Sequence, residues 1–344
     1  MKIPGAENSV LVKAKAKLSK HLSADDFSTL LSFTTTNEIT DYLKNRTCYS
    51  SVMSSYSASA PYRGQFTALL AVNRLDELVE ISRYEKQGAD NACKYLFFKR
   101  DCEQVLRRFR TLGEEIDEFY LNILPEEYKS FSKIDSAEMA GFTTSEEMLS
   151  FFSETEFEPV VAAAAGKETG ILEAEAVISK LCREKLQTII ANASPGKQRK
   201  ELRETVGMLT DSEALLSLYR LKRTGESNEG VQRLFLDDSV SNLSAKTIDA
   251  IINEPDPSAF FNILHGTPYE KIFAPDSHPS VRVNSVCSNH CRKRIRATTN
   301  ADEAVLCFYY ILQYEINDIS NIFEGARCSA GPEIIKQFIY SYTL

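Results

Sequence analysis

The strongest candidate metal ligands of this 344-residue sequence lie in the segment Cys287-Ser288-Asn289-His290-Cys291, with His278 upstream. Two thiols and an imidazole this close together are ligand types that Zn²⁺ prefers. Structural zinc sites usually pair two knuckles, however, and the chain has no C-x-x-C to supply the second one. We therefore expect no metal here and interpret the segment as reduced thiols on a loop or at a helix start. Zinc bound by Cys287, His290 and Cys291 is the alternative.

Four cations follow directly, in Arg292-Lys293-Arg294-Ile295-Arg296. Such a run is ordinarily a solvated or salt-bridged face. The functional alternative is contact with anionic lipid headgroups or with an acidic partner surface. A nuclear localisation signal also fits the composition, although that motif has poor specificity. We therefore treat Arg292, Lys293, Arg294 and Arg296 as candidate membrane or partner contacts.

Motifs for catalysis or cofactor binding do not occur in the sequence. There is no G-x-x-x-x-G-K-[ST], H-E-x-x-H, G-x-S-x-G or G-x-G-x-x-G. Gly166-Lys167-Glu168-Thr169 is similar to the end of a phosphate-binding loop, but Val161 occupies the place of its first glycine. Nothing singles out an acid–base pair among the 48 carboxylates. We predict a non-enzymatic protein without a cofactor.

The composition predicts an all-α fold. Gly (14) and Pro (11) make up about 7% of the chain, against roughly 12% in a typical protein. Since these residues break helices and form turns, their scarcity favours long helices with few hairpins. The 43% hydrophobic and 26% charged residues are ordinary for a folded globular protein.

The charge and hydropathy of the sequence restrict the classes of partner and the cellular location that we expect. A net charge of −8 argues against nucleic acid as the main partner. The longest apolar run is residues 304–312, well short of the ~18 residues that span a bilayer. The polar N-terminus does not resemble a secretory signal, and the eight cysteines are interpreted as reduced thiols in a cytoplasm.

Internal repetition is the most informative feature of the sequence. Residues 47–53, 155–161 and 267–273 each begin with a threonine, place an aromatic residue two positions later and end in two apolar residues. They are separated by 108 and 112 residues. A second register aligns Asp101 with Asp211 at an offset of 110, and a weaker third copy begins at Glu315. Both registers therefore give a period of about 110 residues.

A third register supports the same period and also predicts a helix start. Leu22-Ser23-Ala24 and Leu243-Ser244-Ala245 are 221 residues apart, twice the period. Ser23 is placed to cap its helix, with Asp26 positioned for the reciprocal bond. We expect three similar helical modules, at residues 1–95, 96–205 and 206–344. Three copies of this length are more naturally closed around a pseudo-threefold axis than stacked in a line.

The last long helix has the clearest packing pattern. Its apolar residues are spaced 4-3-4-3-4 and are Val305, Tyr309, Leu312, Ile316, Ile319 and Phe323. This stripe predicts a core seam inside the protein. A docking seam for a partner helix is the alternative. Gly325 is expected to end the helix in a left-handed turn.

From Val10 to about Phe338, the chain resembles the C subunit of archaeal and bacterial A/V-type ATPases, called subunit d in eukaryotic vacuolar enzymes. Residues 13–18 and 22–27 are similar to the opening helix and first cap of that family, and residues 211–220 to its middle segment. Residues 315–322, 325–327 and 332–335 are similar to the closing helix of that family, its glycine stop and its final short helix, respectively.

The resemblance implies three helical modules arranged as a pseudo-threefold funnel. It also implies a non-catalytic central-stalk subunit of a rotary ATPase, peripheral on the cytoplasmic side of the membrane. The subunit would couple the axle subunits to the proteolipid ring, so that ATP synthesis or hydrolysis is linked to proton or sodium transport. The direction of that coupling and the ion belong to the motor and the ring rather than to this chain. The rival interpretation is a helical interaction scaffold unrelated to a rotary motor.

Overall fold

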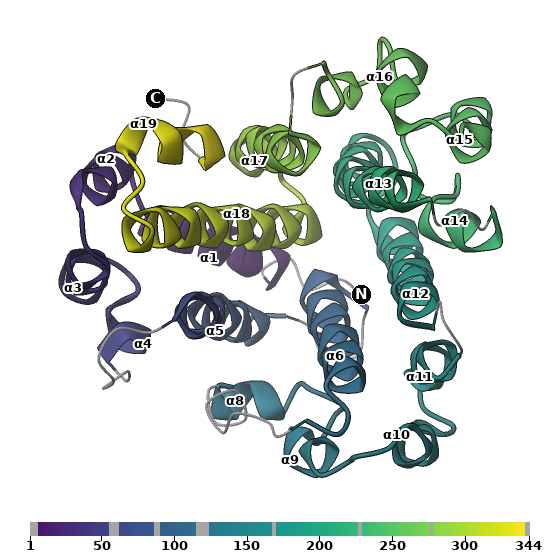
Figure 1. Cartoon of the computed structure of the whole chain (residues 1–344), viewed down its shortest axis with the longest axis horizontal. Coiled ribbons are helices and arrows are strands. Elements are labelled where there is room, and N and C mark those ends of the chain that lie inside the picture. Colours follow the sequence, from purple (N-terminus) through teal and green to yellow (C-terminus); the bar gives the residue numbers. More distant parts are fainter. Residues whose placement is uncertain are drawn as a thin grey trace. The chain divides into compact units, whose positions relative to one another are not determined.

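The computed structural model describes residues 6–54, 62–85, 90–114, 124–166, 170–225, 229–275 and 278–340, and every regular element in these ranges is a helix. Figure 1 shows this arrangement, which confirms the all-α prediction. The chain divides into two compact units: unit 1 holds residues 1–87, 122–128 and 284–344, and unit 2 holds residues 88–121 and 129–283. The three modules and their pseudo-threefold axis stay a prediction.

Unit 1 joins the two ends of the sequence. Its helices from the first part of the chain are α1 (Ala6–Leu18), α2 (Ala24–Ser32), α3 (Thr36–Arg46), α4 (Ser50–Ser54) and α5 (Arg63–Ser82). From the last part come α18 (Ala301–Arg327), α19 (Pro332–Ile335) and the 3-10 helix η3 (Lys336–Phe338). The short α8 (Glu126–Lys129) and the long α17 (Pro279–Ala297) each cross a boundary between the two units.

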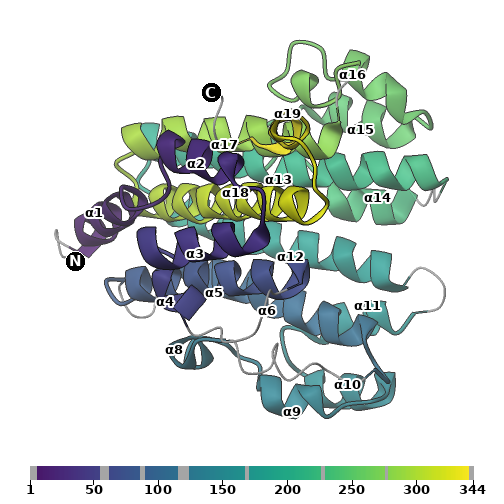
Figure 2. The ribbon, with the colours of Figure 1, turned by 60° about the vertical axis from the view of Figure 1, so that its left-hand side comes forward.

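Helix α18 is the centre of unit 1. It packs along α1 and α5 and also contacts α2, α3 and α19 (Figure 1 and Figure 2). All six residues of the predicted apolar stripe are buried, which confirms the core seam. Phe323 stacks on Phe66 of α5, with ring centroids 4.0 Å apart, so the seam holds the N-terminal helices against the C-terminal one.

The end of α18 differs from the prediction. The helix continues past Gly325 to Arg327, and the left-handed residue is Ser329, with φ 55°. A Cβ at Gly325 would lie 2.5 Å from the side chain of Ile335 in α19. The glycine is therefore needed for the close approach of α19 rather than for a left-handed turn.

Unit 2 is built around α12 (Gly170–Asn192). This helix packs against α6 (Ala92–Arg110), α11 (Glu158–Ala164), α13 (Lys197–Thr224) and α14 (Glu229–Phe235). The remaining helices are short: α9 (Ser136–Ala140), α10 (Ser145–Phe152), α15 (Ala245–Asn253), η1 (Pro257–Ala259), α16 (Phe260–Ile263) and η2 (Glu270–Ile272).

Reciprocal side-chain caps define the starts of α2, α3 and α10. Ser23 and Asp26 form the predicted capping box at α2. Thr35 with Glu38 at α3, and Thr144 with Glu147 at α10, form the same reciprocal pair. Each box satisfies backbone N–H groups that the first turn leaves unpaired, so these helices start at defined residues.

Candidate functional site: three buried acids

The three acids that the sequence aligned are all buried, at 1–2% exposure, inside long helices: Asp101 in α6, Asp211 in α13 and Glu315 in α18. A buried carboxylate is costly unless hydrogen bonds or an opposite charge compensate it. The hydrogen-bond donors and charged groups around each acid therefore show which segments of the chain the acid connects. We name the three sites after their acids.

The Asp211 site lies in unit 2 and has only uncharged donors at hydrogen-bond distance. The Tyr269 hydroxyl donates to Oδ2 at 2.6 Å, and the backbone N–H of Asn242 donates to the same oxygen at 2.9 Å. Burial raises the pKa of Asp211 to about 6, although hydrogen bonds from Tyr269, Ser241 and Asn242 act in the opposite direction.

The Asp101 site, also in unit 2, has the same plan with different donors. Ser132 Oγ donates to Oδ1 at 2.9 Å, and the Lys133 N–H donates to Oδ2 at 3.0 Å. Phe157 occupies the place of Tyr269 in the repeat, so no hydroxyl is available there; its ring stacks on Phe98 instead.

The Glu315 site in unit 1 contains an ionised histidine. Tyr49 Oη donates to Oε1 of Glu315 at 2.7 Å, and His21 Nδ1 lies 2.8 Å from the same oxygen. His21 Nε2 lies 2.9 Å from Glu77 Oε2, and the Cys48 thiol lies 3.6 Å from Nδ1. Burial acts to lower the pKa of His21, but the charge of Glu315 and the hydrogen bonds to Cys48, Glu315 and Glu77 raise it to about 12.

The repeated threonines fix the turns that carry the three aromatic residues. In each copy the threonine hydroxyl donates to the carbonyl at the end of the preceding helix and accepts from the N–H of the aromatic residue. These distances are 2.7 and 3.2 Å for Thr47, 2.7 and 3.2 Å for Thr155, and 2.6 and 3.3 Å for Thr267. The hydroxyl thus fixes a turn that aims the next ring inward.

Sequence reasoning identified the acids and the threonines but missed His21, Cys48 and Glu77. A signal for His21 was present: the register of Leu22-Ser23 with Leu243-Ser244 places it opposite Asn242, the residue before the equivalent leucine. In the structure both residues contact the acid of their own site. No sequence spacing pointed to Cys48 or Glu77, which approach His21 from α3–α4 and α5.

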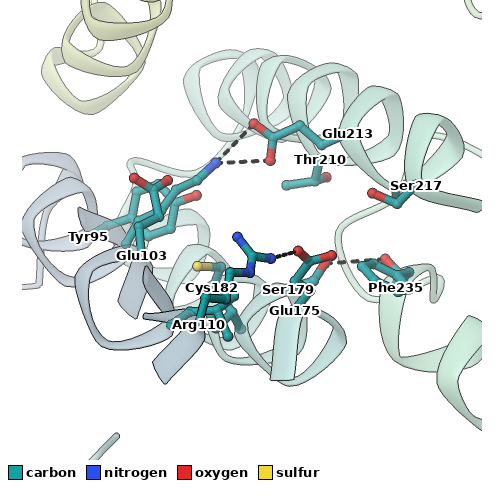
Figure 3. Close-up of a pocket in the computed structure, with 14 residues that line it drawn as sticks. Tyr95, Glu103, Arg110, Glu175, Ser179, Cys182, Thr210, Glu213, Ser217 and Phe235 are labelled. Carbon is teal, nitrogen blue, oxygen red and sulfur yellow. Dashed lines mark hydrogen bonds and ion pairs between the residues drawn. The ribbon is translucent and has the colours of Figure 1, made fainter. Parts of the chain in front are cut away.

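A cavity of about 300 Å³ in unit 2 is lined by α6, α12, α13 and α14 (Figure 3). Lys99 Nζ lies 2.9 Å from both carboxylate oxygens of Glu213, and Arg110 pairs with Glu175. Burial alone would lower the pKa of Lys99, but the charge of Glu213 raises it well above its usual range. Since each ion pair joins α6 to a neighbouring helix, we interpret them as braces rather than as reactive groups.

The predicted contact cations have different surroundings on α17. Lys293 and Arg296 are exposed, and Arg292 is half-buried. Arg294 forms a two-pronged ion pair with buried Glu303, with Nε–Oε1 at 2.6 Å and Nη2–Oε2 at 3.1 Å. Arg294 therefore holds the α17–α18 turn, which leaves Lys293 and Arg296 as the exposed candidates.

The thiols of the alternative zinc site face the protein interior. Cys287 and Cys291 are buried, one turn apart on α17. A hydrogen bond to Cys307 of α18, together with burial, raises the pKa of Cys291. Within the described ranges, Cys287, His290 and Cys291 do not bring their ligand atoms within 4.8 Å of one another. All eight cysteines carry free thiols.

The described residues form an all-α protein in which buried acids fasten loops to long helices. Among the described residues, no helix has the length and hydropathy needed to cross a membrane. The chain belongs to the ATP synthase (C/AC39) subunit family, whose sequence model matches residues 10–338. No curated protein matches the chain significantly.

Proposed function

We propose that this chain is the non-catalytic central-stalk subunit that couples the axle subunits of a rotary A/V-type ATPase to its proteolipid ring. The observation that carries the proposal is the family match over residues 10–338, nearly the whole chain. In this role the protein lies on the cytoplasmic side of the membrane, and torque passes through it in the direction that the motor and the ring determine.

A transmission element has to resist deformation, and the interior of each unit is suited to that task. Buried aromatic and aliphatic side chains fill the space around α18 and α12. The three acid sites fasten loops to long helices through hydrogen bonds of 2.6–3.0 Å. Close-packed interiors with satisfied polar groups deform little under load. These features support a mechanical role, which requires no chemistry from the chain.

Lys293 and Arg296 are the residues that we propose for contact with an acidic partner or with anionic headgroups. The test is the double charge reversal Lys293→Glu/Arg296→Glu, with Lys246→Glu, at another exposed position, as the matched control. Arg294 stays unchanged because of its pair with Glu303. Loss of ring attachment in the double variant alone supports the assignment, and full attachment in both variants contradicts it.

The coupling role itself is tested by purification of the tagged full-length chain from its native membranes under conditions that keep rotary complexes intact. We expect the catalytic head, the axle subunits and the proteolipid ring to co-purify. Recovery of the tagged chain without any of them would overturn the proposal and favour an independent helical scaffold. Recovery of the head and axle without the ring would limit the role to the axle side.

A further inference from the structure

The Glu315 site brings together a thiol, an imidazole and a carboxylate from three distant parts of the chain. Cys48 Sγ lies 3.6 Å and Glu315 Oε1 lies 2.8 Å from His21 Nδ1. The three donor atoms all lie within 4.8 Å of one another, and no other set of three His, Cys, Asp or Glu side chains among the described residues has this spacing. Three donor atoms this close together are spaced as the ligands of one bound ion can be.

We propose that Cys48, His21 and Glu315 bind a divalent zinc-type ion. Sulfur, nitrogen and oxygen donors at about 2.3, 2.0 and 2.1 Å from a tetrahedral zinc would themselves lie roughly 3.3–3.6 Å apart. The distance from Cys48 Sγ to His21 Nδ1 already fits. The distance from Nδ1 to Glu315 would open by about half an ångström, as a hydrogen bond is replaced by two metal bonds.

The surrounding groups supply an outer shell for such a site. Glu77 accepts from His21 Nε2–H at 2.9 Å, which fixes the ring orientation and leaves Nδ1 for the metal. Tyr49 Oη holds the carboxylate of Glu315 at 2.7 Å. A ligating histidine whose second nitrogen donates to a carboxylate is the usual arrangement in zinc proteins.

The exchange of protons for metal keeps the charge of the cluster constant. Metal ligation needs the thiolate of Cys48 and an imidazole nitrogen of His21 that carries no proton. A divalent ion displaces one proton from Nδ1 and one from the thiol, so two positive charges enter as two leave. The buried site therefore gains a metal without an additional uncompensated charge.

An acidic cavity provides a path for the ion. It measures about 370 Å³, and its lining includes Cys48 and Glu77 of the cluster. The other charged residues of the lining are the acids Asp76, Glu80 and Glu127 and the cations Lys17 and Arg83, so carboxyl groups outnumber cations by four to two. Burial, together with Glu80, Glu127 and Glu77, raises the pKa of Asp76 to about 6. An excess of carboxyl groups of this kind attracts cations, and the cavity reaches the cluster at Cys48.

The other two copies of the repeat do not have these ligands. At the positions of His21 and Cys48, the Asp101 site has Lys133 and Glu156, which form an ion pair at 2.6 Å. The Asp211 site has Asn242 and Pro268 there. The thiol–imidazole pair is thus particular to the copy that joins the two ends of the sequence, where a bound ion would link the loop after α1, the turn after α3 and helix α18.

The test uses the purified full-length chain, treated with a chelator and titrated with Co²⁺ as a spectroscopic substitute for zinc. We expect a single high-affinity site, with visible d–d bands and a thiolate-to-cobalt charge-transfer band that Zn²⁺ abolishes. Cys48→Ser should lose the charge-transfer band. The control Cys328→Ser, at an exposed cysteine, should keep it. No band in the wild-type chain, or a band that survives Cys48→Ser, overturns the proposal.

Further measurements distinguish the loss of a ligand from unfolding of the variant and from metal binding at the alternative site on α17. Far-UV circular dichroism shows whether Cys48→Ser stays helical, and Glu315→Gln, which keeps a hydrogen-bonding side chain, tests a second ligand. Zinc titrations in buffers of different ionisation enthalpy should show release of two protons per ion. If Cys291→Ser abolishes the band while Cys48→Ser retains it, the metal lies on α17 and the proposal is wrong. The test needs no rotary partner, so it is independent of the proposed function.

Discussion

The Glu315 and Asp211 sites occupy the same position in the repeat but satisfy their carboxylates differently. In unit 1, Glu315 contacts His21, whose pKa is raised to about 12, and the hydroxyl of Tyr49. In unit 2, Asp211 accepts from uncharged donors, which are the Tyr269 hydroxyl, the Asn242 N–H and the Ser241 hydroxyl. The two sites therefore have the same arrangement of backbone turns. They differ in charge because the residue two positions before the capping serine is His21 in unit 1 and Asn242 in unit 2.

Because of this difference, the two sites should contribute to stability in different ways when a charge is removed or the pH is changed. A buried ion pair is strongly destabilised when one partner is removed, because an unpaired charge remains. A carboxylate with neutral donors can instead take up a proton, so its contribution depends on pH. We expect unit 1 to be sensitive to charge deletion. We expect unit 2 to be more stable in mild acid and to lose stability as the pH rises toward neutral.

The largest expected effect is that of Glu315→Gln, which leaves the His21 cation with Glu77 alone. We expect the free energy of unfolding at pH 7 to fall by about 3–5 kcal/mol, as for other buried pairs that lose one charge. Urea unfolding followed by circular dichroism measures it. Glu333→Gln, at a side chain that is 84% exposed, is the control and should stay within about 0.5 kcal/mol. A loss below about 1 kcal/mol for Glu315→Gln would show that the pair is not essential.

The second effect is the pH dependence at Asp211. The pKa of this carboxyl is about 6 in the folded protein and ordinarily 3.8, so the folded state binds the proton more tightly. The stabilisation is fully present below pH 3.8 and is lost as the pH rises through 6. At about 1.4 kcal/mol per pKa unit, the loss is about 3 kcal/mol. The unfolding free energy of the wild type minus that of Asp211→Asn should therefore fall by about 2–3 kcal/mol between pH 4 and 7.

The Glu315 site should respond in a different pH window. The pKa of His21 is raised from 6.5 to about 12, so its stabilisation is full below pH 6.5 and declines as the pH rises toward 12. His21→Gln should therefore remove a pH dependence above 6.5 and leave the range from pH 4 to 6 unchanged. If Asp211→Asn and His21→Gln altered the same pH range, the distinction between the two sites would be lost.

The third effect concerns the two tyrosine hydroxyls. Tyr269→Phe should cost about 1–2 kcal/mol at pH 7, because one of the neutral donors to Asp211 disappears. Tyr49→Phe should cost less, since Glu315 keeps the stronger bond to charged His21. Chemical denaturation of both variants gives the comparison. Phe157, which already occupies this position at the Asp101 site, shows that the repeat tolerates the missing hydroxyl. A larger loss for Tyr49→Phe would contradict the ranking.

Much of this architecture could be predicted from sequence because it depends on local and periodic signals. Helix content, the capping box at Ser23 and the buried stripe of α18 follow from composition and spacing. The repeat register also aligned Asp101, Asp211 and Glu315 before their burial was known. Such signals persist because each copy must bury the same face of its helices.

The remaining features depend on contacts between residues that are distant in sequence. Cys48 meets His21 across 27 residues, and Glu315 meets it across 294, separations at which spacing carries no information. Gly325 was misinterpreted because the approach of Ile335, rather than a left-handed turn, requires it. Arg294 looked like a surface cation, since its pair with Glu303 forms only when α17 folds back on α18.

The smallest effect tests whether the two sites share their backbone plan. Thr47→Val and Thr267→Val each remove a hydroxyl that bonds the preceding helix end and the N–H of the following tyrosine. Since the two turns match within about 0.1 Å in these distances, each variant should lose about 1 kcal/mol, with a difference below about 0.5 kcal/mol. Ser28→Ala, on the exposed side of α2, controls for the loss of a helical hydroxyl. Equal losses at the two threonines, beside unequal pH windows at the two acids, would assign the difference between the sites to His21 and Asn242 rather than to the turns. Clearly unequal losses would instead place part of that difference in the backbone.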